Sequence, residues 1–143
     1  MEGMGRILAL DVGERRIGVA VSDPASVIAQ PLEVLTRTEE AADVARLAAL
    51  ADEYECGTIV VGLPVGLRGQ EGPAAERVRA FADRLQAATQ AEIVLWDERL
   101  TTVEATRAMR EDGRDERWRR GVVDKVAAAI ILRSYLEARA RGA

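Results

Sequence analysis

The sequence contains no histidine and only one cysteine, Cys56. Without histidine, serine–histidine triads, histidine general bases and imidazole zinc sites are excluded. A single cysteine can form no internal disulfide, thiolate zinc site or iron–sulfur cluster. The catalytic chemistry that remains is that of carboxylates, alone or with a hard metal ion.

Aromatic residues, at 3% of the chain, and long apolar runs are also scarce. No apolar run approaches the length that spans a bilayer, so we expect no membrane partner. The N-terminus lacks the charged and then apolar pattern of a signal peptide, and together with the single cysteine this predicts a reducing, cytoplasmic location. With 143 residues, 48% of them hydrophobic, the chain (1–143) can form a single domain with a true core.

The net charge of −4 argues mildly against a nucleic-acid partner. The distribution of charge along the chain argues for such a partner, because residues 107–143 carry ten basic and six acidic side chains. Nineteen of the twenty basic residues are arginine, which suits phosphate, although for composition alone a general replacement of lysine by arginine is the better explanation. A stronger indication is a charged loop whose arginines would grip backbone phosphates. These arginines are Arg114, Arg117, Arg119 and Arg120.

Hydrophobic periodicity predicts an alternation of strands and helices along the chain. We expect strands at 6–12, 17–22, 27–35, 58–62 and 93–97, and helices at 39–54, from 73 onward, at 101–111 and from 118 or 121 to 139. Pro31 would be tolerated at a sheet edge or a bulge. The first three strands form an antiparallel meander, and the whole order suggests a mixed α/β sheet with helices on both faces.

Three carboxylates stand at places where acids are rarely tolerated unless they are paired or bind a metal. Asp11 ends the first strand, Glu98 closes the last strand and Asp124 opens the final apolar helix. Taken singly, Asp11 could bond turn amides and Asp124 could cap its helix. Glu98 could pair with Arg99 or Arg107. Taken together, the three acids predict an oxygen-lined site for Mg²⁺ or Mn²⁺.

Asp97 and Glu98 compete for one of these positions, because adjacent strand residues point to opposite faces of a sheet. We favour Glu98, since it is longer and stands where the strand ends, with Asp97 as the alternative. Near Asp124, small residues (Gly121, Ala127, Ala128) would let the helix approach the sheet closely, although ordinary tight packing would use the same residues.

A glycine-rich segment, 62–73, joins a predicted strand to a predicted helix, and its backbone amides could hold a phosphate. The segment lacks the Gly-Lys-Ser/Thr of the P-loop and the spacing of the dinucleotide fingerprint. Spacing alone favours a flexible connection, and the role of the segment stays open.

Five segments of the chain, in order, resemble the YqgF (RuvX-like) family, which is described both as pre-16S rRNA nucleases and as Holliday-junction-resolvase-like proteins. The segments are Leu10–Ala20, Val60–Pro64, Glu71–Pro73, Asp97–Thr102 and Asp124–Ala128. Singly they are weak motifs, whereas the series is specific because it spans nearly the whole chain.

This resemblance implies a ribonuclease-H-like α/β fold: a mixed five-stranded sheet of order 3-2-1-4-5, with strand 2 antiparallel and helices on both faces. It also implies an acidic metal site formed by Asp11, Glu98 and Asp124. A polar, substrate-binding shell would surround that site. Its members would be Arg15 or Arg16, Arg99, Thr101, Thr102 and Lys125.

We predict metal-assisted hydrolysis of phosphodiester bonds with two Mg²⁺ or Mn²⁺ ions, where Asp11 bridges the ions and Glu98 and Asp124 each hold one. The resemblance points to maturation of the 5′ end of precursor 16S rRNA, with structured or single-stranded RNA as the substrate. Residue types alone do not separate RNA from branched DNA. Resolution of a Holliday junction would need two active sites and hence a homodimer.

Two other classes stay open from the residues alone. An Asp-x-Gly after an apolar strand also opens the phosphate-binding hairpin of actin-like ATPases and sugar kinases, but these enzymes need two such domains. A non-catalytic nucleic-acid-binding module in transcription or ribosome assembly is the other alternative, although a pure binder gains nothing from three acids that repel phosphate.

Overall fold

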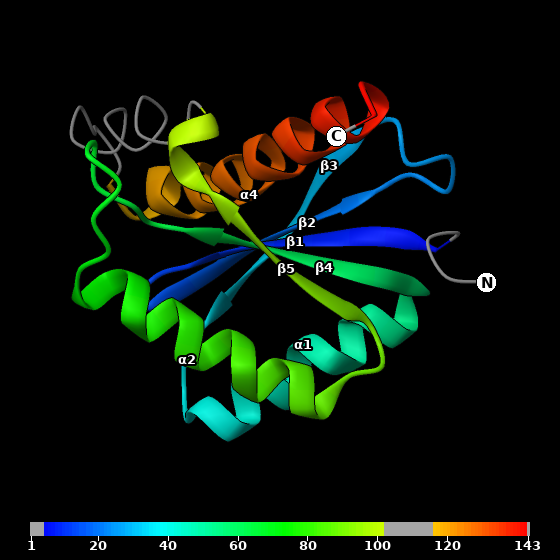
Figure 1. Cartoon of the computed structure of the whole chain (residues 1–143). Coiled ribbons are helices and arrows are strands. Elements are labelled where there is room, and N and C mark those ends of the chain that lie inside the picture. Colours follow the sequence, from blue (N-terminus) through cyan, green and yellow to red (C-terminus); the bar gives the residue numbers. More distant parts are fainter. Residues whose placement is uncertain (1–4, 102–115, 143) are drawn as a thin grey trace.

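The computed structural model describes residues 5–101 and 116–142, and within 116–123 it describes the backbone alone. Five strands and the helices that flank them form the described part of the chain (Figure 1). The strands are β1 (Arg6–Val12), β2 (Arg16–Ser22), β3 (Ala29–Thr36), β4 (Cys56–Leu63) and β5 (Glu92–Asp97). The helices are α1 (Glu40–Glu53), α2 (Pro73–Ala88), the short 3₁₀ turn η1 (Glu98–Leu100) and α4 (Glu116–Ala140).

The strands form one mixed sheet in the order β3-β2-β1-β4-β5, which confirms the predicted topology. Strand β2 runs antiparallel to both of its neighbours, whereas β1, β4 and β5 are parallel. Pro31 lies in the edge strand β3, next to a register shift opposite Val19 and Ala20. Both conditions that make a strand proline tolerable, an edge and a bulge, are therefore met there.

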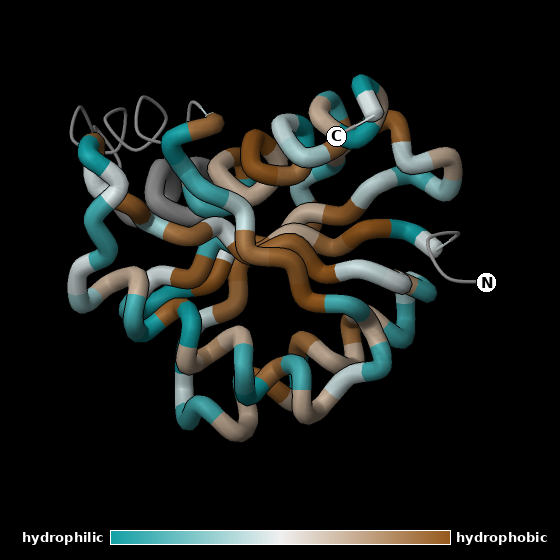
Figure 2. Tube along the Cα trace, viewed as in Figure 1, coloured by the Kyte–Doolittle hydropathy of each residue, from teal (hydrophilic) through white to brown (hydrophobic). Residues whose placement is uncertain are grey.

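Helices cover both faces of the sheet: α1 and α2 lie on one side and α4 crosses the other (Figure 1). Alternating strand residues supply the two cores, because successive side chains point to opposite faces. Leu8 and Leu10 belong to the core under α1 and α2, while Ile7 and Ala9 belong to the core under α4. The hydrophobic segments run along the central strands between the two helical layers (Figure 2). No helix within the described residues is long and apolar enough to cross a membrane.

Strand β3 begins at Ala29, two residues later than the predicted start at Val27. The cause is the carboxylate of Asp23, which accepts hydrogen bonds from the backbone amides of Val27 and Ile28 at 2.7 and 2.8 Å. Because these two amides donate to the Asp23 side chain within the turn, they are not available to form hydrogen bonds in the sheet. The same two bonds lower the pKa of Asp23, because they stabilise its charged form.

Helix α4 begins at Glu116, earlier than the predicted start at 118 or 121. Asp124 therefore lies eight residues into the helix and cannot be its cap, since capping bonds form only in the first turn. The expected arginine loop is also wrong in part, because Arg117, Arg119 and Arg120 lie on the first turns of α4. Most of the helix predicted at 101–111 lies outside the described residues.

Candidate active site

Asp11 is placed by the alternation of β1. Ile7 and Ala9 face α4, so Asp11, two residues further on, points to the same side of the sheet. Its cross-strand partner on β2 is Gly18. Asp11 is 5% exposed, which is low for a carboxylate near a strand end.

Gly18 brings the second acid to Asp11. A Cβ atom on Gly18 would lie 2.0 Å from the backbone oxygen of Asp124, so only a glycine allows α4 to approach β2 this closely. Ala127 and Ala128 are both fully buried along the same helix, in agreement with the predicted tight packing. The carboxylate of Asp124 is 6% exposed and accepts a hydrogen bond from Nε of Arg16 at 2.8 Å. A strand glycine and a strand arginine thus fix Asp124 from β2.

Glu98 reaches the same face from β5. Val94 and Trp96 pack in the core under α4, and the alternation carried one step further turns Glu98 to that side. A second glycine makes room for it, since a Cβ on Gly62 of β4 would lie 3.0 Å from Oε1 of Glu98. The hydroxyl of Thr101 donates to the carbonyl oxygen of Glu98 at 2.8 Å, which holds the turn η1.

The side chain of Asp97 binds Arg99 and does not line the pocket that Asp11, Glu98 and Asp124 share. Its carboxylate caps η1 by accepting a hydrogen bond from the Arg99 amide at 2.8 Å, and the Arg99 guanidinium binds it at 2.7 Å. The bonds from Arg99 hold the pKa of Asp97 below its usual value. The observed partner of Arg99 is therefore Asp97, and not Glu98 as one alternative proposed.

Asp11, Glu98 and Asp124 line one pocket of about 950 Å³ at the edge of the sheet where β1 and β4 end. Side chains from both helical layers and from the β1–β2 turn complete its wall. The charged residues around it comprise five acids and four arginines. They are Asp11, Glu14, Glu40, Glu98 and Asp124 with Arg15, Arg16, Arg37 and Arg77.

The three buried acids fit a divalent metal ion in the type of their donors and in their common location. Carboxylate oxygens suit Mg²⁺ and Mn²⁺, and each of the three is less than a tenth exposed. Among the described residues, no three acidic or cysteine side chains are already gathered tightly enough to form a metal centre. Ion binding therefore requires the side chains to turn toward a common point, and Asp124 to bind the ion while Arg16 contacts its Oδ2.

The predicted substrate-binding residues do not all lie in one place. Arg15 and Arg16 line the pocket, whereas Arg99 and Thr101 act on the turn that carries Glu98. Lys125 follows Asp124 on α4, is half-buried and does not line the pocket. Thr102 and Arg114 lie outside the described residues. Arg117, Arg119 and Arg120 are described by their backbone alone.

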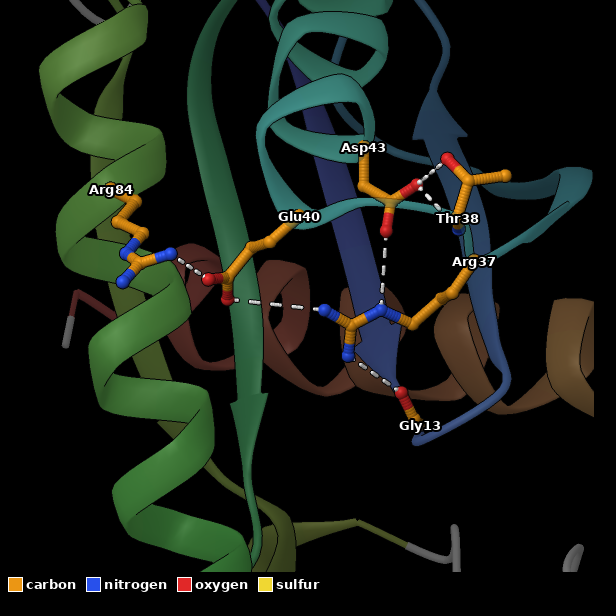
Figure 3. Close-up of polar contacts among 6 residues, drawn as sticks. All are labelled: Gly13, Arg37, Thr38, Glu40, Asp43 and Arg84. Carbon is orange, nitrogen blue, oxygen red and sulfur yellow. Dashed lines mark hydrogen bonds and ion pairs between the residues drawn. The ribbon is translucent and has the colours of Figure 1, made fainter.

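No local pattern in the sequence indicates the partly buried ion pair between Arg37, which lines the pocket, and Asp43 (Figure 3). Asp43, on α1, is 2% exposed and accepts hydrogen bonds from Nε of Arg37 at 3.4 Å and from the amide and hydroxyl of Thr38 at 3.1 and 3.2 Å. Because buried charges need partners, these bonds hold the chain reversal between β3 and α1.

The same arginine supports the turn that follows Asp11. The Arg37 guanidinium donates to the carbonyl oxygen of Gly13 at 3.0 Å, and it also lies 3.9 Å from Glu40, which binds Arg84 of α2 (Figure 3). Its guanidinium carbon stands 5.2 Å from the centre of the Phe81 ring. Arg37 thus ties the β1–β2 turn to both helices of that face.

The glycine-rich segment 62–73 closes on itself. The amide of Gly66 donates to the carbonyl oxygen of Gln70 at 2.8 Å, and the amide of Arg68 donates to the Gln70 side chain at 3.0 Å. Gly69 adopts a positive φ of 85°, which a glycine tolerates without strain. Because these two amides bond within the loop, they are not available to hold a phosphate, which the sequence had left open as one role of the segment.

Residues 5–138 match a family model described as RuvX, Holliday junction resolvase. A Clostridium botulinum protein named as a candidate pre-16S rRNA nuclease is 47% identical over 132 residues, which cover 92% of this chain and 96% of that protein. A protein of the same name from Desulforudis audaxviator is 44% identical over 137 residues, which cover 96% of this chain and 97% of that protein.

Solved structures of resolvases share the fold. RuvC of T. thermophilus, in complex with a Holliday junction substrate, aligns with a TM-score of 0.62 at 16% identity and covers 95% of this chain and 96% of its own. The fowlpox virus resolvase in complex with Holliday junction DNA aligns with a TM-score of 0.54 at 10% identity, covering 94% and 98%. These alignments confirm the predicted fold class.

Proposed function

Because this chain belongs to the RuvX family, we propose that it is a metal-dependent nuclease whose reaction takes place in the acidic pocket. One observation carries the proposal: buried carboxylates from a strand, a 3₁₀ turn and a helix, Asp11, Glu98 and Asp124, line the same pocket. Burying three acids in one place is costly unless a cation compensates them. Arginines from the same pocket add groups that bind phosphate.

Asp11, Glu98 and Asp124 would hold the ions. When bound, two divalent ions supply an activated water and stabilise the leaving oxygen of a phosphodiester. The chain itself orients the donors: Arg16 holds Asp124, Gly62 leaves room for Glu98, and the Thr101 hydroxyl fixes the turn that carries Glu98. Arg99 binds Asp97 and keeps this neighbouring acid away from the pocket.

We propose precursor 16S rRNA, cut near its 5′ end, as the substrate. The curated relatives at 44 and 47% identity bear that substrate in their names, and the alignments cover more than nine-tenths of both chains. A single active site is sufficient for trimming an rRNA end. The cytoplasm, where ribosomal precursors are processed, is the compartment that this function requires.

Cleavage of branched DNA is the second candidate. The family model is described as a Holliday junction resolvase, and the T. thermophilus RuvC structure holds a junction substrate. Symmetric cutting of a junction requires two active sites and therefore a dimer. A monomeric protein would therefore exclude the second candidate, whereas a dimer is compatible with both.

The test is to compare cleavage of precursor 16S rRNA, an unrelated single-stranded RNA and a four-way DNA junction. Each substrate is incubated with Mg²⁺, Mn²⁺ or a chelator, and with the wild-type protein or the Asp11→Asn variant. We expect metal-dependent cutting of the precursor that the variant loses. Paired cuts in the junction by a dimer would favour the second candidate. Binding without cleavage under any metal would contradict the nuclease and favour a non-catalytic binding module.

A further inference from the structure

The acidic pocket has a cationic rim on the side of α1 and α2, opposite the layer formed by α4. Arg15, in the turn between β1 and β2, and Arg77, on the second turn of α2, both line the pocket. Arg15 belongs to the substrate-binding shell that the family resemblance implies, whereas Arg77 belongs neither to that shell nor to the predicted arginine loop between 114 and 120. The position of these two arginines suggests that the substrate extends across the end of the sheet.

The four arginines around the pocket differ in their hydrogen-bond partners within the protein and in their exposure. Arg16 is bound to Asp124, and Arg37 is bound to Gly13 and the buried Asp43. The side chains of these two are only 27% and 21% exposed, and their bonds support the site itself. Arg15 and Arg77 are exposed, which leaves their guanidinium groups accessible to a ligand.

Arg77 has a competitor for that ligand within the chain. Its guanidinium donates a hydrogen bond to the carboxylate of Glu14 at 3.1 Å, and the two side chains are 58% and 78% exposed. This pair bridges the β1–β2 turn and α2 at the rim of the pocket. Ion pairs this exposed are weak, so a stronger anion can displace Glu14 at little cost.

A phosphodiester is such an anion. Arginine binds phosphate through two parallel N–H···O bonds, which a single carboxylate oxygen at the end of a mobile glutamate does not match. Phosphate brought to the pocket also meets five carboxylates, so arginine contacts at the rim are needed to offset their repulsion.

Building on the proposed nuclease function, we propose that Arg77, with Arg15 in the wall of the same pocket, forms a subsite for a backbone phosphate of the polynucleotide substrate. Glu14 is its internal competitor: it occupies Arg77 in the free protein and gives way when the phosphate enters. This subsite places the nucleotides next to the cleaved bond over the N-terminal end of α2. Arg77 thus acts as a substrate-binding residue, and the three acids remain the groups that act on the cleaved bond.

The test is binding of a fluorescent single-stranded RNA, followed by anisotropy across a salt series with a chelator present. Removing one phosphate contact lowers the slope of log affinity against log salt by about 0.7, which corresponds to about fivefold weaker binding at about 0.1 M salt. We expect this result for Arg77→Gln. Glu14→Gln should tighten binding about twofold, as expected when a weak exposed pair is removed. In the Arg77→Gln/Glu14→Gln double variant that gain should disappear.

A second ion pair of the chain provides the matched control. Arg46 of α1 binds Glu33 of β3 at 3.3 Å, and neither residue lines the pocket. Arg46→Gln and Glu33→Gln change the net charge in the same way and should bind RNA like the wild type. The proposal is overturned if Arg46→Gln weakens binding as much as Arg77→Gln. It is also overturned if Glu14→Gln tightens binding equally without Arg77, or if the wild type does not bind RNA at all.

Cleavage assays of the same variants keep this proposal separate from the nuclease function. If cleavage depends on metal and on Asp11 while Arg77→Gln and Arg46→Gln bind alike, the subsite is wrong and the nuclease function stands. If no metal supports cleavage but the coupling between Glu14 and Arg77 is observed, the nuclease function is wrong and the subsite stands.

Discussion

Gly18 of β2 and Asp124 of α4 are in backbone contact, with space for no more than a hydrogen on the Cα of Gly18. A Cβ at this position would lie 2.0 Å from the carbonyl oxygen of Asp124. Gly18 is also the cross-strand partner of Asp11. One glycine therefore determines how closely the helix that carries one acid approaches the strand that carries another.

Replacing Gly18 by alanine should push α4 away from the sheet. Because the obstructing atoms are backbone, the clash cannot be relieved by a rotamer change, and we expect a loss of about 1–3 kcal/mol in the free energy of unfolding. Denaturant unfolding measures this loss. Gly57→Ala is the matched control, since its Cβ would meet no atom closer than 3.8 Å. Equal stability of the two variants would contradict the assigned role of Gly18.

Gly62→Ala should affect activity more than stability. Its Cβ would meet Oε1 of Glu98 at 3.0 Å and Cδ1 of Ile131 at 2.6 Å, and both atoms are the ends of flexible side chains. The fold can adjust, so the loss in unfolding free energy should be smaller than for Gly18→Ala. Displacing Glu98, a proposed metal ligand, is more serious, and we expect the cleavage rate to fall by about tenfold or more. An unchanged rate would show that Glu98 does not depend on this space.

The strand order and the three acids could be predicted from the sequence, because strand ends and family motifs are local patterns. The choice between Asp97 and Glu98 needed one further fact, namely which face α4 covers. Once Ile7 and Val94 are known to face α4, alternation assigns Asp11 and Glu98 to that side. The start of α4 was missed because Asp115, a residue type favoured before a helix, stands in a run of charged residues that is equally typical of a loop.

Other contacts leave no local pattern in the sequence. Arg37 and Asp43 meet because the chain reverses between β3 and α1, and Arg77 meets Glu14 across 63 positions. Which side chains meet depends on how whole helices and strands pack together, and hydrophobic periodicity does not specify this packing. Sequence patterns and the family resemblance therefore located the acids that line the pocket, together with Arg15 and Arg16, but not Arg37 or Arg77.

Asp97 should contribute to stability in a pH-dependent way without being required for cleavage. Arg99 lowers the pKa of Asp97 in the folded protein, so its stabilising effect is complete above the unfolded value of about 3.9 and is lost as the pH falls through the folded value. For Asp97→Asn we expect a loss of about 0.5 kcal/mol at pH 7, because the pair is partly exposed, and a smaller further loss on acidification than in the wild type. Unfolding curves between neutral and acidic pH measure both. A loss of cleavage in this variant would instead identify Asp97 as part of the site.

Asp43→Ala should destabilise the fold strongly. It removes a buried carboxylate that accepts bonds from Arg37 and Thr38 and leaves the half-buried arginine without its main partner. Breaking a buried ion pair from one side costs about 3 kcal/mol. Glu33→Gln, which breaks the exposed pair with Arg46, should cost less than about 0.5 kcal/mol. If chemical denaturation gave the two variants the same stability, the Arg37–Asp43 pair would not hold the β3–α1 connection.

The central claim is that Asp11, Glu98 and Asp124 together bind a divalent ion, and it is tested most directly by titrating the protein with Mn²⁺. The wild type is compared with Asp11→Asn and with Asp97→Asn, whose acid lies next to the site but outside the pocket. We expect saturable Mn²⁺ binding by the wild type and by Asp97→Asn, and an affinity at least about tenfold lower for Asp11→Asn, since each ligand contributes strongly at such sites. Equal Mn²⁺ affinity of Asp11→Asn and the wild type would contradict it.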